Sequence, residues 1–428
     1  MSKKIAVPAL CLSFALVSCG GTSSTVPSNP VAPTLPPPPT VFTIQPSSGS
    51  PVLTAAQRSA LNFQYGPPDG TIGVLLNGGI YTFFMAARSS SSCTGTPAVQ
   101  GTYRFSGSLS SITAPYPCSA QVTPSANGDP NGYTFDQDYA GGGPVLAVTS
   151  ATGASGLLHI YHGEAHGGTC GTTGHCTYAS LGMAFSQNGG ATFSKIGEIV
   201  QPYLTRSAIL GTNQNLDIGG GTLVIADGTG AHIANLATAD PSNMYLYVFY
   251  SDRDPSAATG SACNQTPCIA LARAPLATVV ADAFAGNTAA FPGLFRKFYN
   301  GGFTEPATSG DPNAATNSGH YTPVIATPGS FSSVLYDAST QQYLIAYTTG
   351  NNAISLQHGP TLLSWSGPIT SGAISDGTNT ILYPTLVGEG TDPATGNGDP
   401  WLFYIDATAW PSWPSATLVS RRLQLTYK

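Results

Sequence analysis

Short apolar runs, separated by turn residues, recur along the chain and occur in pairs. They are rich in aromatic and β-branched side chains and are bounded by Gly, Pro, Asn, Asp or Ser. Runs of this length and composition are typical of β-strands. Each pair consists of a candidate inner strand and a second strand that ends in aromatic residues: 71–76 with 80–84, 144–149 with 158–162, 221–226 with 246–250, 331–336 with 344–347, and 383–387 with 402–405.

A third strand follows several of these pairs, for example at 178–186 and 353–357. A unit of three or four strands that occurs five times predicts an all-β fold, a five-bladed β-propeller in which each unit forms one blade. The units are unevenly spaced, so we expect large insertions, above all between Arg253 and His320. We assign the propeller to residues 62–428 as one large domain.

The composition favours strands over helices. Of 428 residues only 8% are charged, whereas Gly (50) and Pro (35) are abundant. Long exposed helices need Lys and Glu, which are scarce here, so the composition argues against an all-α fold. The formal net charge is −6 and no run of Lys or Arg follows residue 4. The sequence therefore predicts no nucleic-acid partner.

The amino terminus resembles a bacterial export signal. Lys3 and Lys4 precede an apolar stretch, 5–17, which is too short to span a bilayer. Cys19 then follows a small residue, as in lipoprotein signals whose cysteine is lipidated. The alternative is an ordinary signal peptide that happens to contain a cysteine.

We predict a signal peptide over 1–18 and a linker rich in Pro, Ser and Thr over 19–51, since four consecutive prolines favour an extended chain. The protein is then exported and anchored through its lipid to the bacterial cell envelope, at the outer membrane or the cell surface. The membrane is thus one predicted partner.

Six cysteines remain after the signal region, and an even number in an exported chain suggests disulfides. Local pairing closes the shortest loops, so among the many possible connectivities we predict Cys93–Cys118, Cys170–Cys176 and Cys263–Cys268. Zinc is the alternative near Cys170 and Cys176, where His166 and His175 are close in sequence, although no second cysteine pair of matching spacing supports such a site. We predict no metal centre and no cofactor, and leave a structural Ca²⁺ open.

Acidic residues number only 20, so those near the predicted inner strands are informative. Two carboxyl groups that lie close together can divide acid–base work, because burial or a like-charged neighbour keeps one of them protonated. Asp69 precedes the first inner strand, Asp136 and Asp138 precede the second, and Asp217 precedes the third.

His162 and Glu164 lie at the end of a predicted strand in the second unit. Alternate residues of a strand share a face, so the two side chains are candidates for a pair that tunes a proton donor or binds sugar hydroxyls. The alternative is structural: Glu164 caps a loop and His162 fills a buried site with satisfied hydrogen bonds.

The repeats and motifs resemble the five-bladed β-propeller glycoside hydrolases, the superfamily of arabinanases, β-xylosidases, invertases and levansucrases. Those enzymes place an acidic residue at the start of several inner strands, which Asp69-Gly70-Thr71-Ile72 and Asp217-Ile218 match. Arg253-Asp254-Pro255 resembles the Arg-Asp-Pro of invertases and levansucrases. The acidic residue that the family carries at its fourth blade is matched most nearly by Glu305.

A second resemblance concerns a turn. The stretch 186–193, Ser-Gln-Asn-Gly-Gly-Ala-Thr-Phe, resembles the Asp box of sialidase-like propellers, with Asn in place of Asp. This motif joins the outer strands of a blade and is structural in role.

The resemblance implies a glycoside hydrolase or glycan-binding protein that acts on extracellular carbohydrate through acidic residues in the central funnel. A non-catalytic cell-surface binding scaffold is the alternative, because a fold does not fix a function. The candidate catalytic residues are Asp69, Asp138, Glu164 and Asp217, and the candidates for substrate binding are Asp136, His162, Arg253 and Glu305.

Overall fold

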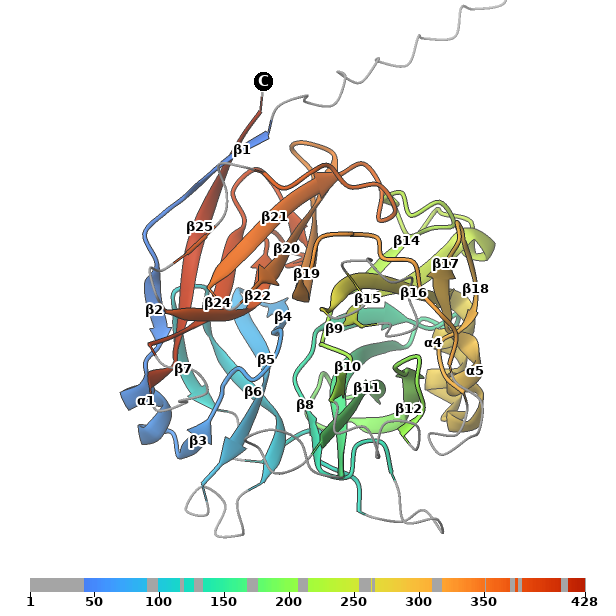
Figure 1. Ribbon diagram of the computed structural model, residues 1–428, viewed down its shortest axis with the longest axis horizontal. Coiled ribbons are helices and arrows are strands. Elements are labelled where there is room, and N and C mark those ends of the chain that lie inside the picture. The colour runs from blue at the N-terminus through green and yellow to red at the C-terminus, as the bar shows by residue number, and fades with distance from the viewer. Residues whose placement is uncertain are drawn as a thin grey trace, which may run out of the picture. The chain divides into compact units, whose positions relative to one another are not determined.

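The computed structural model describes thirteen parts of the chain: 42–90, 99–115, 119–126, 134–167, 176–206, 215–253, 263, 266–309, 318–350, 352–369, 374–375, 379–408 and 415–427. The chain divides into two compact units, 1–37 and 38–428, and every described residue belongs to the second. In that unit five mainly antiparallel sheets surround a common axis (Figure 1). This arrangement confirms the predicted five-bladed β-propeller.

Each blade is one sheet, and the predicted strand pairs form the inner two strands of each. Blade one contains β4 (Gly73–Asn77), β5 (Ile80–Ser89), β6 (Gln100–Ser108) and β7 (Ser111–Pro115), with β3 (Phe63–Tyr65) also on β5. Blade two contains β8 (Tyr139–Gly141), β9 (Val145–Thr149), β10 (Ser155–Gly167), β11 (Cys176–Ser186) and β12 (Ser194–Val200), with β13 (Leu216–Asp217) parallel to β11.

Blade three contains β14 (Leu223–Asp227), β15 (Met244–Asp252), β16 (Cys268–Pro275), β17 (Arg296–Tyr299) and β18 (Gly302–Pro306), in that order outwards. Blade four contains β19 (Ser330–Asp337), β20 (Gln342–Thr349) and β21 (Ala353–Gly359), with β23 (Thr395–Gly396) parallel to β19. Blade five contains β22 (Thr380–Val387), β24 (Trp401–Ala407) and β25 (Thr417–Tyr427).

The beginning of the described chain completes blade five. Both β1 (Phe42–Pro46) and β2 (Ser50–Leu53) pair antiparallel with β25, so strands from the two ends of the chain share one sheet. Ile44 is 1% exposed and Leu53 is 2% exposed, so this segment is part of the core. The predicted linker, 19–51, is therefore too long, and the propeller begins before residue 62. Without this segment β25 would present a long unpaired edge, which folded proteins avoid.

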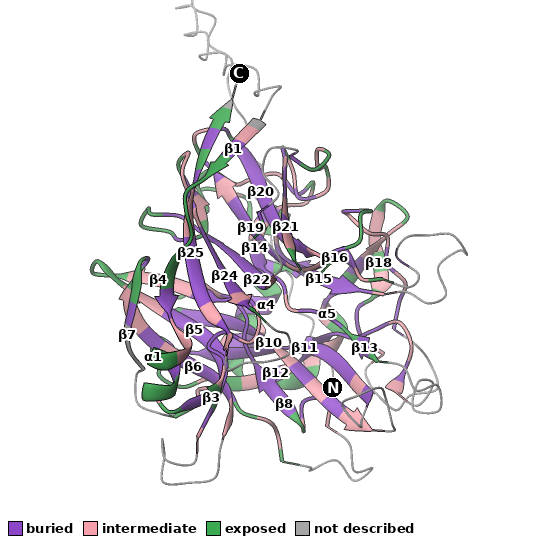
Figure 2. Cartoon of the chain, turned by 60° about the vertical axis from the view of Figure 1, so that its left-hand side comes forward, coloured by how far each residue is buried: buried purple, intermediate pink, exposed green. Residues whose placement is uncertain are grey.

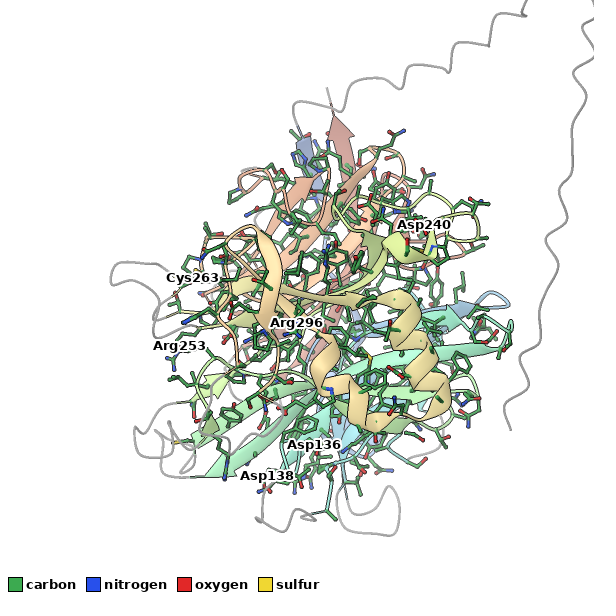
Figure 3. The ribbon with its side chains drawn as sticks, turned by 90° about the vertical axis from the view of Figure 1, so that its right-hand side faces the viewer. Asp136, Asp138, Asp240, Arg253, Cys263 and Arg296 are labelled. Atoms are coloured by element: carbon green, nitrogen blue, oxygen red, sulfur yellow. A yellow bond between two sulfur atoms is a disulfide. The ribbon has the colours of Figure 1, made fainter. Side chains whose placement is uncertain are left out.

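The apolar core lies between neighbouring blades, where the faces of adjacent sheets pack together (Figure 2). Helices are few and lie outside the blades (Figure 3). The longest, α4 (Leu276–Ala285), follows β16 and buries Val279 and Ala283 against blades two and three. The shorter helices are α1 (Ala55–Ala60), α5 (Phe291–Leu294), η2 (Pro241–Asn243) and η3 (Thr288–Ala290). Within the described residues, no helix has the length and apolarity needed to cross a membrane.

One predicted disulfide, Cys263–Cys268, is confirmed. Cys176 is also disulfide-bonded. Cys93, Cys118 and Cys170 lie outside the described residues, so the other two pairings stay predictions.

The turn at 186–193 joins β11 to β12, the outer strands of blade two. Ser186 Oγ donates to Asn188 Oδ1 at 2.8 Å, and the same Asn188 oxygen accepts from the Thr192 amide at 3.0 Å. The resemblance to an Asp box stays a prediction from sequence.

Four hydroxyl side chains, here called the hydroxyl belt, connect the blades near the axis: Thr71, Thr222, Ser333 and Thr385. Each lies at or just before an inner strand and is at most 9% exposed. Thr71 Oγ1 donates to the carbonyl of Gly221 at 3.2 Å, which joins blade one to blade three. Blade two has Pro144 at the equivalent place, and there the Gly143 amide donates to the Thr71 carbonyl at 3.1 Å.

The remaining belt bonds follow one pattern. Thr222 Oγ1 donates to the Ser332 carbonyl at 3.1 Å and accepts from the Val334 amide at 3.2 Å. Two equivalent bonds of 2.9 Å run from the Leu386 amide to Ser333 Oγ and from the Ile72 amide to Thr385 Oγ1. The next blade thereby supplies hydrogen-bond partners to buried peptide groups near the axis.

We predict that Thr222→Val destabilises the protein by about 1–3 kcal/mol, because it leaves a buried amide and a buried carbonyl without their partner at nearly unchanged volume. Urea unfolding followed by tryptophan fluorescence would measure the change. Thr82→Val, at a half-buried position of β5 outside the belt, is the matched control. Equal stability of the two variants would contradict a stabilising role for the belt.

Candidate active site

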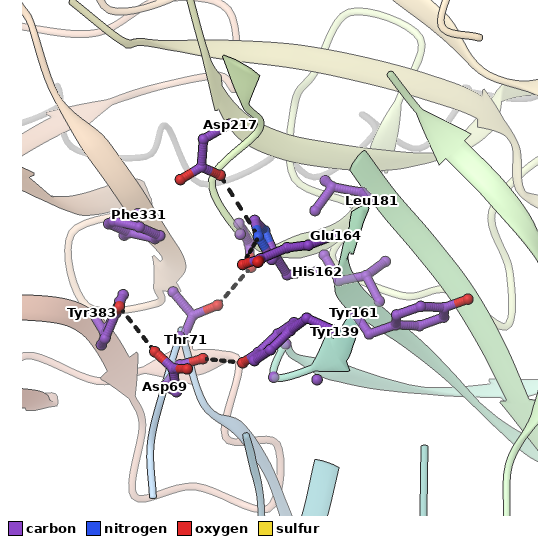
Figure 4. A pocket seen from close by; sticks show the side chains of 17 residues that line it. Asp69, Thr71, Tyr139, Tyr161, His162, Glu164, Leu181, Asp217, Phe331 and Tyr383 are labelled. Atoms are coloured by element: carbon purple, nitrogen blue, oxygen red, sulfur yellow. Dashed lines mark hydrogen bonds and ion pairs between the residues drawn. The ribbon is translucent and has the colours of Figure 1, made fainter. Parts of the chain in front are cut away.

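An open cavity lies on the propeller axis, on one side of the hydroxyl belt (Figure 4). Including the part that is open to solvent, this cavity has a volume of about 490 Å³. Thr71 and Gly221, which are bonded to each other, line this cavity and also a second one on the other side of the belt. The belt therefore forms the floor of the axial cavity.

The same backbone position in every blade contributes to the wall of the axial cavity. This position lies two residues before the belt residue or, in blade two, before Pro144. Because the belt fixes the register of the inner strands, the five side chains or glycines at this position all face the axis. They are Asp69, Gly142, Gly220, Phe331 and Tyr383, and all five line the cavity.

His162, on β10, lies between two carboxylates. Its Nε2 is 3.0 Å from Glu164 Oε1 and 3.7 Å from Asp217 Oδ1, while its Nδ1 is 3.0 Å from the carbonyl oxygen of Ile218. Since every one of these oxygens is an acceptor, both ring nitrogens must donate, and the ring is an imidazolium. Burial alone would lower the pKa of His162, but the two carboxylates raise it to about 9.

Glu164 is held between two imidazoles. His162, Glu164 and His166 alternate along β10, so their side chains share the face that points to the cavity mouth. The predicted His162–Glu164 pair is confirmed, and Glu164 Oε2 also lies 2.6 Å from His166 Nε2. Burial would raise the pKa of Glu164, but these hydrogen bonds and charges lower it to about 2. Glu164 thus stays ionised throughout the neutral range.

Asp69 differs from Glu164 in its surroundings. Its Oδ1 accepts a hydrogen bond from Tyr383 Oη at 3.1 Å, and its backbone carbonyl accepts one from Tyr139 Oη at 3.0 Å. Burial, together with the negative charge of Glu164, raises the pKa of Asp69 to about 6, although Tyr383 and His162 favour the charged form. Asp69 can therefore carry a proton in mildly acidic solution.

Asp217, on β13, is the third carboxylate of the cavity. Its side chain is 49% exposed and contacts the same His162 nitrogen as Glu164, so this nitrogen lies between the two carboxylates. Desolvation of the covered half of this side chain, together with the charge of Glu164, raises the pKa of Asp217, while the charge of His162 lowers it. Asp69 and Asp217 lie on either side of the His162–Glu164 pair (Figure 4).

Phe331 and Tyr383 form an aromatic corner of the cavity. Their rings pack edge to face, with centroids 4.7 Å apart and planes at 84°. Both residues have left-handed backbone angles, φ 51° and 60°, at irregularities in the pairing of β19 and β22. The left-handed region is unfavourable for aromatic residues, and such strain concentrates at functional sites.

The sequence patterns placed Phe331 and Tyr383 at the starts of inner strands but did not identify them as site residues. A usable signal is present: each lies two residues before a belt hydroxyl, the spacing that also separates Asp69 from Thr71. Aligning the blades on the belt hydroxyls would have found them.

Two of the predicted site residues, Asp136 and Asp138, lie next to β8 and do not line the cavity. Asp136 is fully buried, accepts a hydrogen bond from Tyr161 Oη at 3.0 Å and forms an ion pair with Lys195. A carboxylate enclosed in this way is structural, so the prediction that it binds substrate is wrong. Asp138 is exposed, and its Oδ2 accepts from the backbone amide of His166 at 2.6 Å, which supports the end of β10 instead of facing the cavity.

Arg253 and Glu305 also lie outside the axial cavity. Arg253 donates from Nη2 to the carbonyl of Asn215 at 2.6 Å. Glu305 lies on β18, the outermost strand of blade three, paired with Lys297 of β17. The outermost strand of a blade lies far from the axis. The prediction that Glu305 matches the acidic residue of the family's fourth blade is therefore wrong. Asp254 of the Arg-Asp-Pro motif lies outside the described residues.

The cavity is rich in negative charge. Its described lining includes three carboxylates and His162 but neither Lys nor Arg. Among the described residues, no group of three or more His, Cys, Asp or Glu side chains is arranged to hold a metal ion. The chemistry that the lining itself offers is proton transfer between carboxyl groups of different pKa.

Comparisons with known proteins give no family assignment, since no protein-family model and no curated protein matches the chain. Similar solved structures include the catalytic domain of a GH62 α-L-arabinofuranosidase from Coprinopsis cinerea, at 11% identity, over 91% of this chain and 98% of that chain, with a TM-score of 0.46. A glycosyl hydrolase from Bacteroides ovatus has 8% identity to this chain, with a TM-score of 0.43. The match covers 84% of this chain and 85% of that chain. The α-L-arabinofuranosidase of Podospora anserina has 11% identity over 90% and 98%, with a TM-score of 0.43. Similarities this low carry no argument about chemistry, which rests on the geometry of the cavity.

We predict that the His162 ring titrates near pH 9, because its charged form contacts two carboxylates. With seven histidines in the chain, ¹⁵N-histidine labelling and NMR titration can resolve it, and His162→Gln identifies the signal. Because the folded pKa exceeds the unfolded value, this contribution to stability is complete below about pH 6.5 and is lost as the pH rises through 9. A titration near pH 6.5 would contradict the imidazolium assignment.

Proposed function

We propose that the protein is a glycoside hydrolase that cleaves carbohydrate in the axial cavity, with Asp69 and Asp217 as its carboxyl pair. One observation carries this proposal: Asp69 and Asp217 line one cavity, on either side of a third carboxylate, Glu164, that is hydrogen-bonded to His162. Glycoside hydrolysis requires one carboxyl group that donates a proton and another that is ionised, and different environments separate their pKa values.

Within this proposal Asp69 is the general acid, since it keeps its proton up to about pH 6. It would protonate the leaving-group oxygen as the glycosidic bond breaks. Asp217 faces the His162 cation, which favours its ionised form, so it would activate water or attack the sugar carbon. Glu164 transfers no proton; it keeps His162 cationic and raises the proton affinity of Asp69.

A non-catalytic glycan-binding protein is the second candidate, and the aromatic corner supports it. Sugar C–H faces pack on aromatic rings, so Phe331 and Tyr383 would serve binding as well as catalysis. Binding requires no proton transfer, whereas hydrolysis requires a carboxyl group that donates a proton and another that is ionised. Turnover therefore separates the two functions.

We expect activity to be bell-shaped in pH, with an alkaline limb near pH 6 as Asp69 loses its proton and an acidic limb set by Asp217. Asp69→Asn should lower turnover about 10²-fold or more on polysaccharide, and much less on aryl glycosides whose leaving groups need no protonation. Asp217→Asn should lower turnover on both. Initial rates over a pH series measure these effects.

The matched control is Asp282→Asn, on the outer helix α4, which should keep wild-type rates. Asp69→Asn should also melt at the same temperature as the wild type or higher at pH 7. Its folded pKa lies above the unfolded value, so the ionised group destabilises the folded state above about pH 4, and the amide removes this cost. Full activity in both amide variants, or unfolding of both, would show that these residues are structural.

We also propose that the protein is exported and anchored to the cell envelope through a lipid on Cys19. The position of this cysteine, after a short apolar stretch and before a Pro-rich segment, supports the proposal. Such an anchor would place the propeller where extracellular glycans are found.

Metabolic labelling with a fatty-acid analogue should tag the wild type, whereas Cys19→Ala should carry no label. Gel fluorescence after click chemistry gives the readout. Label that persists in the variant would exclude Cys19 as the attachment point.

A further inference from the structure

We propose that Tyr383 is a positioning residue for Asp69: its hydroxyl fixes the orientation of the Asp69 carboxyl group, and a strained turn of β22 holds its ring in place. This inference rests on the proposed function, in which Asp69 is the proton donor. Tyr383 is supplied by blade five, whereas Asp69 belongs to blade one, so the contact crosses a blade interface.

Three elements fix Asp69, each through a different group. Its backbone amide donates to the carbonyl of Ala86 on β5 at 2.9 Å, and its carbonyl accepts from Tyr139 on β8 at 3.0 Å. The orientation of the carboxyl group decides the direction of proton transfer, and its Oδ1 accepts a hydrogen bond from Tyr383 Oη at 3.1 Å. Tyr383 itself is only 7% exposed, so its ring is held by packing.

The backbone of β22 aims this ring at Asp69. Tyr383 has φ 60°, and the pairing register of β22 shifts between Leu382 and Thr385. In a regular strand, alternate residues face opposite sides, whereas a left-handed residue at an irregularity redirects its side chain. The same conformation recurs at Phe331 of the preceding blade, whose ring packs edge-on against Tyr383. Strain that occurs at equivalent positions of two blades indicates a shared task.

The belt sets the distance between Tyr383 and Asp69. Two residues after Tyr383, Thr385 Oγ1 accepts from the amide of Ile72, three residues after Asp69. Blade five therefore forms two hydrogen bonds with this segment of blade one: one to the backbone amide of Ile72 and one to the carboxyl group of Asp69. The first contact fixes the register, and the second then fixes the carboxyl orientation.

This geometry assigns different tasks to the two carboxyl oxygens. While Tyr383 donates to Oδ1, the proposal assigns the proton of neutral Asp69 to Oδ2. In the proposed reaction the Oδ2–H bond breaks, the glycosidic oxygen gains the proton, and the carboxylate that forms keeps its hydrogen bond to Tyr383. A freely rotating carboxyl group would present its proton in the productive direction only part of the time.

Tyr383→Phe tests the proposal because it removes the hydroxyl and keeps the ring. The hydroxyl stabilises ionised Asp69, so in the variant the titration of Asp69 should move to higher pH. The ¹³C carboxyl signal of Asp69, assigned with Asp69→Asn, reports this directly and needs no substrate. The alkaline limb of activity should move in the same direction, and kcat should fall about tenfold or more with little change in KM.

Tyr103→Phe is the matched control, since it removes another buried hydroxyl of blade one, bonded to the Val99 carbonyl at 2.7 Å. It should leave the Asp69 titration at its wild-type position. Phe331→Leu keeps the Tyr383 hydroxyl but removes the ring that packs on it, and should shift the titration in the same direction by a smaller amount. This second variant decides the question if Tyr383→Phe does not fold.

An Asp69 titration that stays unchanged in Tyr383→Phe, or in Phe331→Leu where only that variant folds, would overturn the proposal, even if the wild type hydrolyses glycosides. A shifted titration in a protein that turns over no glycoside would support the positioning role and refute the proposed function. The two failures are thus distinguishable.

Discussion

The hydroxyl belt determines where the inner strands of the propeller begin and how they are aligned. Thr71, Thr222, Ser333 and Thr385 connect buried peptide groups near the axis across blades by hydrogen bonds. The residue two positions before each belt residue, or before Pro144 in blade two, lines the axial cavity. The wall therefore has one carboxylate, two glycines and two aromatic rings at five equivalent positions, and left-handed backbone angles direct the two rings.

The charge pattern in the cavity depends on a single cation. Three carboxylates in one pocket repel each other, and His162 makes their proximity tolerable because it contacts two of them. The repulsion between the carboxylates therefore raises the pKa of Asp69, whose carboxyl group is hydrogen-bonded by the hydroxyl of Tyr383 and contacts no imidazole. Carboxyl groups of nearly equal intrinsic acidity thus reach pKa values of about 6 and about 2 through their surroundings. The ionised Glu164 keeps His162 cationic, and its charge helps Asp69 to retain a proton.

The sequence patterns predicted what depends on short-range order. Paired apolar runs gave the blades, and alternation along β10 gave the His162–Glu164 pair, because both follow from the geometry of a strand. Proximity to an inner strand identified Asp69 and Asp217 but misplaced Asp136 and Asp138, since a shift of one or two residues decides whether a side chain reaches the axis. Long-range pairing was not visible: β1 and β2 lie in a stretch rich in Pro and Ser, and only β25 makes them strands. The redirected rings of Phe331 and Tyr383 depend on backbone angles that apolar periodicity does not encode.

Hydrolysis is the property on which these assignments converge, and it can be measured without knowing the natural glycan. Purified full-length protein, incubated at pH 5 to 6 with a panel of aryl glycosides and plant and microbial polysaccharides, should release phenol or reducing sugar from at least one of them. The same preparation with Asp69 and Asp217 both changed to Asn should release none from that substrate. Binding of a glycan in the axial cavity with no turnover of any substrate on the panel, or turnover that survives in the double variant, would contradict the assignment of these two carboxyl groups as a catalytic pair.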